Sequence, residues 1–277
     1  MRTLAIATLT LLIVPHVRAL DRRLPWGSEA FELPPAPNLV PLPPNEFVHG
    51  RRDENLIALT FDACTTHGAT QYDARITRTL LETGTPATIF MGGRWALKEA
   101  DHVRFLASFP QFELGNHTWS HPHLRQVDEA RIREELQLTQ AALFQLTGRI
   151  PKLFRAPFVE TDARVIRIAG ELGLTTIQND LASGDPDSSV PARELRAWVR
   201  RQATPGAIVV FHMNHLSFRT AEALPGIIQD LKARGFTFVT IGTLLKRSVP
   251  AKIQPTSERP ATTDLRRPES SGTTPVR

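Results

Sequence analysis

Several side chains that can move protons or bind metal stand directly after apolar runs in this sequence. Asp62 follows the run Leu-Thr-Phe, and His212 ends the run Ile-Val-Val-Phe. The same place after an apolar run is taken by His117, Arg155, Asp180 and Asp185. The carboxyl ends of parallel strands meet at one edge of a sheet or barrel, so we expect these side chains to lie together there. Such a group would supply bases, acids and metal ligands.

His117 and His121 are four residues apart in the stretch GNHTWSHPHL. In a helical turn this spacing puts both imidazoles on one face, where they can hold one divalent metal. Taken alone, the pair is better explained as two surface or cap histidines. Pro122 follows, so the segment is predicted to be a loop or a single turn. With Asp62 at the end of a neighbouring strand, a metal site becomes the favoured interpretation.

Arg155 and His212 both leave apolar strands, and each has a structural and a functional interpretation. A buried arginine needs a carboxylate partner, which Asp180 or Asp185 on the next loop could supply. We also expect Asp62 to pair with Arg155 across the site. His212 is either a core histidine with its hydrogen bonds made, or a general acid.

The elements that must position these residues alternate between residues 53 and 246. The expected strands are 56–62, 88–92, 112–117, 153–157, 175–180, 207–213 and 236–241. Strands that alternate with helical patterns predict an α/β fold with a mostly parallel sheet. The pattern alone leaves open whether this sheet is doubly wound or closed into a barrel.

The clearest helix is predicted at about 128–146. Its apolar residues Ile132, Leu136, Leu143 and Leu146 keep to one face. Asp128 is placed to cap its start, and Gly148 follows its end. The last helix is predicted to begin near Pro225 and to end before Gly235.

The charge of the chain excludes one class of function. The sequence has 277 residues and a net charge of +5, and three of those five charges come from residues 247–277. The body is therefore close to neutral, and no cluster of Lys and Arg is interleaved with aromatic residues. We predict no nucleic-acid partner.

The order TFD, HTWSH, RAP, D and FH resembles the polysaccharide deacetylases, also called the NodB-homology group or carbohydrate esterase family 4. The resemblance covers about residues 53–246. It implies a distorted (β/α)₇ barrel with mostly parallel strands. It also implies metal-dependent hydrolysis of N-acetyl or O-acetyl groups on polymers of sugars, with zinc as the expected divalent metal and cobalt or nickel as alternatives.

The resemblance assigns roles to the residues that bind metal and activate water. Asp62 takes the position of the general base, and Arg155 that of the residue that orients this base. His117 and His121 take the positions of the metal ligands. Amide hydrolysis fits this set, because a bound metal makes a nucleophile from water at neutral pH.

The remaining roles concern the oxyanion and the leaving group. Phe158 takes the position whose backbone N–H contacts the oxyanion. His212 takes the position of the acid that protonates the leaving amine. Asp185 resembles the aspartate that fixes the arginine, so it is expected near Arg155.

The sequence departs from the family pattern at the third metal ligand. The family usually has the motif TFDDG, whose second aspartate is the third metal ligand. This chain has Ala63 and Cys64 after Asp62 instead. Three replacements stay open: Asp62 itself with another residue as base, Asp73 at the start of the next helix, and Cys64 or His67. The other alternative is that no metal binds tightly and Cys64 is a small buried residue. Asp73 is the candidate that we carry forward.

Both ends of the chain lie outside the predicted domain of residues 53–246. Residues 1–19 combine Arg2, an apolar stretch at 4–14 and a small-residue cleavage site after Ala19, a pattern typical of a secretory signal peptide. A buried N-terminal helix is the alternative interpretation. Residues 20–52 form a Pro-rich segment, and 247–277 a basic tail expected to be disordered. The mature chain is predicted to be exported to the periplasm or cell exterior, without a stable membrane span.

The predicted function is hydrolysis of acetyl groups on a cell-wall or extracellular glycan, such as peptidoglycan, a chitin-like polymer or an exopolysaccharide. One rival is a catalytically silent glycan-binding protein on the same barrel, favoured by the missing second aspartate. Another is a metal hydrolase that acts on cyclic amides or imides. His215, Phe218 and Arg219 either line a sugar groove or belong to an ordinary loop.

Overall fold

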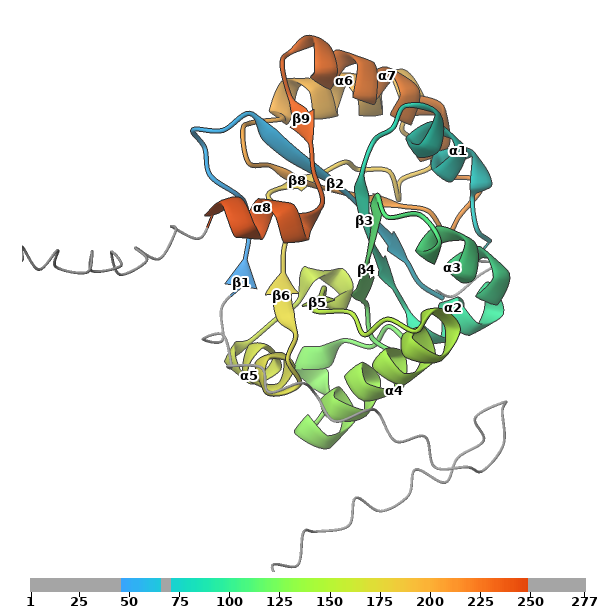
Figure 1. The fold of residues 1–277 in the computed structure, drawn as a ribbon, viewed down its shortest axis with the longest axis vertical. Coiled ribbons are helices and arrows are strands. Elements are labelled where there is room, and N and C mark those ends of the chain that lie inside the picture. The colour runs from blue at the N-terminus through green and yellow to red at the C-terminus, as the bar shows by residue number, and fades with distance from the viewer. Residues whose placement is uncertain (1–45, 66–70, 249–277) are drawn as a thin grey trace, which may run out of the picture.

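The computed structural model describes residues 46–65 and 71–248. Figure 1 shows a curled sheet with helices around its outside. The strands are β1 (Glu46–Phe47), β2 (Leu56–Ala63), β3 (Ala87–Met91), β4 (Phe112–Asn116), β5 (Leu153–Phe154), β6 (Thr175–Ile177), β7 (Leu181–Ala182), β8 (Ile208–His212) and β9 (Thr237–Phe238). The helices are α1 (Ala74–Glu82), α2 (Gly93–Lys98), α3 (Ala100–Ala107), α4 (Glu129–Thr147), α5 (Ala163–Glu171), α6 (Ala192–Gln202), α7 (Thr220–Ala233) and α8 (Ile241–Ser248), with short 3₁₀ turns at Leu124–Gln126 and Pro157–Val159.

All strand pairs in the sheet are parallel. The strand order is β1-β6-β5-β4-β3-β2-β8-β7, and β9 also pairs with β2. Each of the seven predicted strands is present, most of them shorter than expected, and β1 and β7 are additional. The α/β fold and the distorted (β/α)₇ barrel are therefore confirmed, as a curled sheet of parallel strands.

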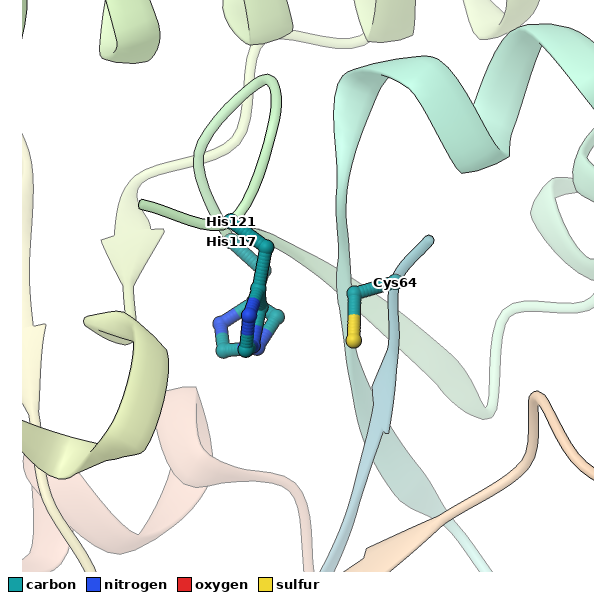
Figure 2. A group of neighbouring side chains, drawn as sticks. All are labelled: Cys64, His117 and His121. Carbon is teal, nitrogen blue, oxygen red and sulfur yellow. The ribbon is translucent and has the colours of Figure 1, made fainter. Parts of the chain in front are cut away.

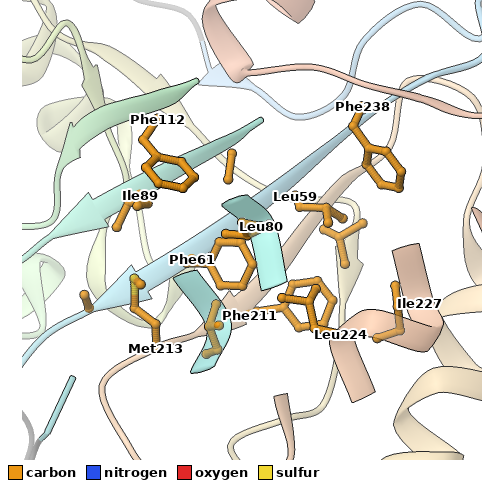
Figure 3. Packing of buried hydrophobic residues seen from close by; sticks show 14 of the residues in the cluster. Leu59, Phe61, Leu80, Ile89, Phe112, Phe211, Met213, Leu224, Ile227 and Phe238 are labelled. Carbon is orange, nitrogen blue, oxygen red and sulfur yellow. The ribbon is translucent and has the colours of Figure 1, made fainter. Parts of the chain in front are cut away.

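Alternate residues of β2 face two different environments, as the period of a strand requires. Ile57, Leu59 and Phe61 belong to the main apolar cluster, which includes residues of α1 and α7. Figure 3 shows this packing, with Phe61 stacked on Phe211 at a centroid distance of 5.6 Å. Ala58 belongs to a second cluster with residues of β3, β5, β6, β8 and α8. Thr60 and Asp62 share the face of Ala58, so polar groups follow apolar ones toward the carboxyl end of the strand.

The predicted helix at 128–146 is confirmed as α4. Asp128 accepts a hydrogen bond from the Arg131 N–H at its start, and Gly148 ends it with φ of +68°. The expectation for the last helix is partly wrong. Pro225 lies inside α7 rather than near its start, and α8 follows in the chain. Gly235 does follow α7, with φ of +82°.

The domain boundaries at residues 53 and 246 stay a prediction. The signal peptide, most of the Pro-rich segment and most of the basic tail lie outside the described residues. Within residues 46–65 and 71–248, no helix is long and apolar enough to cross a membrane.

Gly115 generates a prediction about packing under the site. It pairs with Phe90 in the sheet, and a Cβ atom at Gly115 would lie 2.4 Å from Cδ1 of Phe90. We expect Gly115→Ala to lower the free energy of unfolding by roughly 1–3 kcal/mol, because the ring must shift in a packed interior. Urea unfolding measures this, and adding Phe90→Leu should recover part of the loss. An unchanged midpoint for Gly115→Ala would contradict the overpacking.

Candidate active site

The register of the sheet brings the predicted residues to one edge. Asp62 on β2 is paired with His212 on β8. His117 follows β4, and its N–H donates to the carbonyl of Met91 at 3.0 Å. Arg155 follows β5, and its N–H donates to the carbonyl of Asn116 at 2.9 Å. The expected gathering at the carboxyl ends of the strands is therefore present. Asp180 is the exception, because it binds Arg52 and the N–H of Ile208 at the start of β8.

A buried ion pair lies at the centre of this group. Arg155 is fully buried, and its Nη1 donates to Oδ1 of Asp62 at 2.9 Å and to Oγ1 of Thr60 at 2.8 Å. The guanidinium also lies 4.2 Å from the ring centroid of Phe90. The expected pairing of Asp62 with Arg155 is confirmed. Burial raises the pKa of the Asp62 carboxyl, but the charges of Arg155 and then His117 outweigh burial and hold that pKa below its usual value.

The two histidines present neutral imidazoles. Nδ1 of His117 lies 2.8 Å from the carbonyl oxygen of Arg155 and donates to it, which leaves Nε2 free to act as a ligand. This Nε2 lies 3.9 Å from Oδ2 of Asp62. Burial lowers the pKa of His117, and burial is also the largest cause that lowers the pKa of His121 to about 3. Neutral imidazole is the form that binds metal.

The segment from His117 to His121 is a loop held by a buried carboxylate. Glu135 on α4 is fully buried. It accepts hydrogen bonds from the N–H groups of Trp119 and Ser120, both at 2.7 Å, and from Oγ of Ser120 at 2.6 Å. Arg131 supplies the opposite charge to Glu135. These contacts fix a loop in which Thr118 and His121 have φ near +60°, so the imidazoles are positioned by side chains rather than by a helix.

Cys64 completes a group that could hold a metal ion. Its Sγ and one ring nitrogen each of His117 and His121 lie within 4.8 Å of one another. Figure 2 shows the thiol just after β2 beside the two imidazoles of the loop after β4. Burial and then the charge of Asp62 raise the pKa of this thiol to about 12. One sulfur and two imidazole nitrogens are a donor set that suits zinc, so the residues present fit a metal of this type.

The other candidates for the third ligand do not lie in this group of Cys64, His117 and His121. Asp73 is buried, but it caps α1, and both of its carboxylate oxygens accept hydrogen bonds from Arg75. The structure does not bring it into the group with the two histidines, because helix capping and this ion pair occupy it. Asp62 is engaged by Arg155. His67 lies outside the described residues.

Asp185 pairs with His212 and not with Arg155. Oδ1 of Asp185 lies 2.9 Å from Nδ1 of His212, and Oδ2 accepts from the backbone N–H of His212 at 2.7 Å. Thr220 adds a further donor to the same carboxylate. The predicted contact with Arg155 is wrong because β7 pairs with β8, which carries the Asp185 loop to His212. Burial lowers the pKa of His212, but the hydrogen bond and charge of Asp185 outweigh burial and raise that pKa above its ordinary value.

Aromatic side chains lie at two sides of the site. Phe158 is 51% exposed with φ of +58°, its ring stacks on His123 at 4.0 Å, and it meets His121 edge-on at 4.7 Å. After β8, Phe218 lies 4.6 Å from His215 and 6.0 Å from His212 between ring centroids. Phe158 is exposed beside the loop that carries His121, whereas Phe218 is half-buried. Arg219 is exposed and pairs with Glu222.

Sequence reasoning missed two buried residues of this site. Glu135 lies three positions after Ile132, on the apolar face of the predicted helix, and a charge on that face was a usable signal. Asn214, which contacts Cys64, follows the strand of His212 in FHMNH. Its type and place gave no comparable signal.

Comparisons with known proteins agree with the fold. The family model for polysaccharide deacetylase matches residues 49–177. A peptidoglycan-N-acetylglucosamine deacetylase from Bacillus cereus is 30% identical over 195 residues, which are 69% of this chain and 69% of that protein. The chain belongs to the polysaccharide deacetylase family. The family is named for the removal of acetyl groups from polysaccharides.

Two further proteins that are similar to this chain are described differently, one as an enzyme and the other as a pseudoenzyme. A chitin deacetylase from Pestalotiopsis sp is 28% identical over 199 residues, which are 69% of this chain and 64% of that protein. The crystal structure of a pseudoenzyme of the CE4 family from Bacillus anthracis has a TM-score of 0.68 and 27% identity, covering 74% of this chain and 70% of the other. The shared fold is thus compatible with both active and inactive sites.

The ion pair generates a stability prediction. Asp62→Asn should lower the free energy of unfolding by about 3 kcal/mol or more, because it leaves the Arg155 charge buried without a counter-charge. The double variant Asp62→Asn/Arg155→Met should recover part of this loss, since the unpaired charge is gone. Urea unfolding of the single and double variants measures both effects. The exposed pair Arg104–Asp101 is the control, and Asp101→Asn should change little. Additive effects of the two site substitutions would contradict the coupling.

The Asp185 contact generates a prediction about titration. His212 faces Asp185 and Asp62, which raise its pKa, and Arg155, which lowers it. Asp185→Asn removes the largest raising contribution, so the pKa of His212 should fall below its wild-type value. Carbon-detected NMR titration of the imidazole measures this. Asp187→Asn on the same loop is the control, because Asp187 bonds Ser189 instead. A pKa of His212 that stays the same in Asp185→Asn would refute the assignment.

Proposed function

We propose that this protein is a metal-dependent deacetylase that removes acetyl groups from amino sugars of a cell-wall or extracellular glycan. The observation that carries the proposal is the pair of opposed groups at the strand ends. Asp62 is held as an anion by buried Arg155, and His212, held by Asp185, is paired with Asp62 in the sheet register. A base and an acid held at the ends of two neighbouring strands are what amide hydrolysis requires.

His117 and His121 would hold the metal, with the Cys64 sulfur within reach. When bound, a divalent metal lowers the pKa of water and polarises the acetyl carbonyl. The protein contributes neutral imidazoles in fixed orientations, because the Arg155 carbonyl sets the tautomer of His117 and Glu135 holds the loop.

Asp62 is the group that takes a proton from the attacking water. Its Oδ1 is engaged with Arg155, and its Oδ2 lies on the side of His117. The low pKa of its carboxyl keeps it anionic at neutral pH, so it is ready to accept a proton. The backbone N–H of Phe158 is proposed to stabilise the charge that develops on the carbonyl oxygen, as in the family pattern.

His212 is the group that gives a proton to the leaving amine. Its Nδ1 is engaged with Asp185, so Nε2 is the atom that can donate. Its raised pKa keeps it protonated closer to neutral pH than an ordinary histidine. An amine is a poor leaving group unless it is protonated, so this acid is required for bond cleavage.

The substrate and location rest on the relatives and on the N-terminus. The relatives named above are described as acting on peptidoglycan and on chitin, so an N-acetylated polymer of this kind is the proposed substrate. The signal-peptide pattern of residues 1–19 supports export, which would bring the protein to such a polymer.

A silent glycan-binding protein is the second candidate. Two observations favour it: Ala63 replaces an expected metal-binding aspartate, and a structural neighbour is a pseudoenzyme. Four site residues argue against it, since a protein that only binds glycan needs no paired acid and base. These residues are the buried Asp62, Arg155 and Asp185 and the half-buried His212.

Acetate release separates the two candidates. The mature protein should release acetate from chitin oligomers or peptidoglycan. Release should stop with a chelator and return with added zinc or cobalt. His117→Ala should lower both bound metal and acetate release by at least tenfold, because it removes a ligand. His49→Ala is the control, since His49 is exposed and its Nδ1 lies 2.7 Å from the carbonyl oxygen of Gly50. Glycan binding without acetate release under any metal condition would instead establish the silent protein.

A further inference from the structure

Asn214 holds Cys64 from the side of β8. Asn214 is 1% exposed, and its Nδ2 donates to the backbone carbonyl of Cys64 at 2.7 Å. The same Nδ2 lies 3.6 Å from Sγ of Cys64, within hydrogen-bond range for sulfur. Its Oδ1 is buried and finds no partner among residues 46–65 and 71–248. A buried side-chain amide whose oxygen has no hydrogen-bond partner lowers the stability of the fold. The placement of Asn214 beside the thiol therefore calls for a function.

The backbone around both residues is fixed. The Met213 N–H donates to the carbonyl of Asp62 at 3.1 Å, and the Gln71 N–H donates to the carbonyl of Asn214 at 2.9 Å. On the other side, the Gly92 N–H donates to the carbonyl of Ala63 at 2.8 Å. A Cβ atom at Gly92 would lie 3.4 Å from Cα of Cys64, so β3 packs closely against this residue. Cys64 is therefore held between β3 and the end of β8, with its sulfur beside the imidazoles.

An amide N–H directed at a thiol has a specific chemical consequence. It stabilises the thiolate, since hydrogen bonds to an ionised acceptor are stronger than those to a neutral one. Partners of this type orient metal ligands and tune their basicity. Thiolate with two imidazoles selects a borderline or soft divalent ion such as zinc or cobalt, and disfavours magnesium or calcium.

We propose that Cys64 is the third protein ligand of the metal, and that Asn214 is the positioning residue that orients and stabilises its thiolate. This rests on the proposed function, because it assumes that the site takes a metal. Ala63 removes one anionic ligand from the family pattern, and Cys64 restores one anion at the next position in the chain. On binding, the thiol proton passes to solvent and the sulfur lone pair forms the metal–sulfur bond.

Cobalt(II) loaded into the mature chain tests the assignment without relying on activity. A thiolate ligand gives a sulfur-to-cobalt charge-transfer band in the near ultraviolet, which imidazole and carboxylate ligands lack. The wild-type protein should show this band with one cobalt bound. Cys64→Ser should lose the band and bind cobalt at least tenfold more weakly. Cys64→Asp should regain affinity without the band, because a carboxylate replaces the thiolate.

Asn214→Ala isolates the positioning role. It should keep the band with an altered wavelength or intensity and weaken cobalt binding by about 10–100-fold, as loss of a hydrogen-bonding partner of a ligand does. A merely structural asparagine would lower stability without changing the spectrum of the bound cobalt. Asn55→Ala is the matched control, because Asn55 stands just before β2 at the opposite end of that strand.

The outcomes distinguish this proposal from the proposed function. A wild-type protein that binds cobalt through His117 without the band, and Cys64→Ser with equal affinity, would overturn the Cys64 assignment and leave the deacetylase proposal standing. An unchanged spectrum and affinity in Asn214→Ala would remove the role of Asn214 alone. A wild-type protein that binds no cobalt and no zinc would overturn both proposals. Circular dichroism of each variant checks folding, and the wild-type band remains decisive if a variant fails to fold.

Discussion

The buried charge of Arg155 is the constraint on which the rest of the site depends. A guanidinium inside a protein is tolerated only when an opposite charge and further acceptors surround it. Asp62 provides the charge, Thr60 and the Gln178 carbonyl provide acceptors, and the Phe90 ring faces the guanidinium. These contacts come from β2, β3 and the segment after β6, while Arg155 itself follows β5. One ion pair therefore fixes the spacing of several strand ends, and the anionic state of Asp62 follows from the same requirement.

A second buried carboxylate acts on the neighbouring loop in a comparable way. Glu135 is an obligatory acceptor inside the protein, and its partners are the N–H groups of the loop that carries His117 and His121. The loop belongs to no helix or strand, and besides Glu135 it is held by the N–H groups of Gly93 and Arg94, which donate to the carbonyls of Thr118 and Trp119. The N-terminal residues of α2 close it from the other side, where Gly93 leaves no room for a Cβ atom beside Trp119. Two buried charges thus set the positions of base, imidazoles and arginine before any ligand arrives.

The sequence could predict which residues gather but not which of them touch. Apolar runs that end in Asp62, His117, Arg155 and His212 report strand ends, because the alternation of strands and helices forces a parallel sheet. Pairing across the sheet depends on strand order, which the local pattern does not contain. Asp185 was expected near Arg155 because of the family resemblance and because it lies on the loop of the next strand in the chain. In the fold β7 crosses to the far side of β8, so Asp185 reaches His212 and leaves Arg155 to Asp62. Asp73 was misjudged for a different reason: it caps α1 and its two carboxylate oxygens accept hydrogen bonds from Arg75, two residues along the chain.

The departure at residues 63 and 64 has a geometric explanation in the way β2 ends. Ala63 is the last residue of the strand and packs in the main apolar cluster, whereas Cys64 leaves the strand and meets the imidazoles. A metal ligand can therefore shift by one position in the sequence and still lie beside the two histidines. The reason is that side chains no longer alternate between the two faces of the sheet once β2 has ended at Ala63. Replacing a carboxylate by a thiolate keeps the charge of the ligand set but makes it softer, so the change acts on the choice of metal more than on the acid–base groups. In the proposed mechanism Asp62 and His212 carry the proton transfers, and their contacts with Arg155 and Asp185 do not involve residues 63 and 64. On the proposal that Cys64 binds the metal, residues 63 and 64 exchange one metal ligand for another, and the intact contacts of Asp62, Arg155 and His212 agree with that proposal.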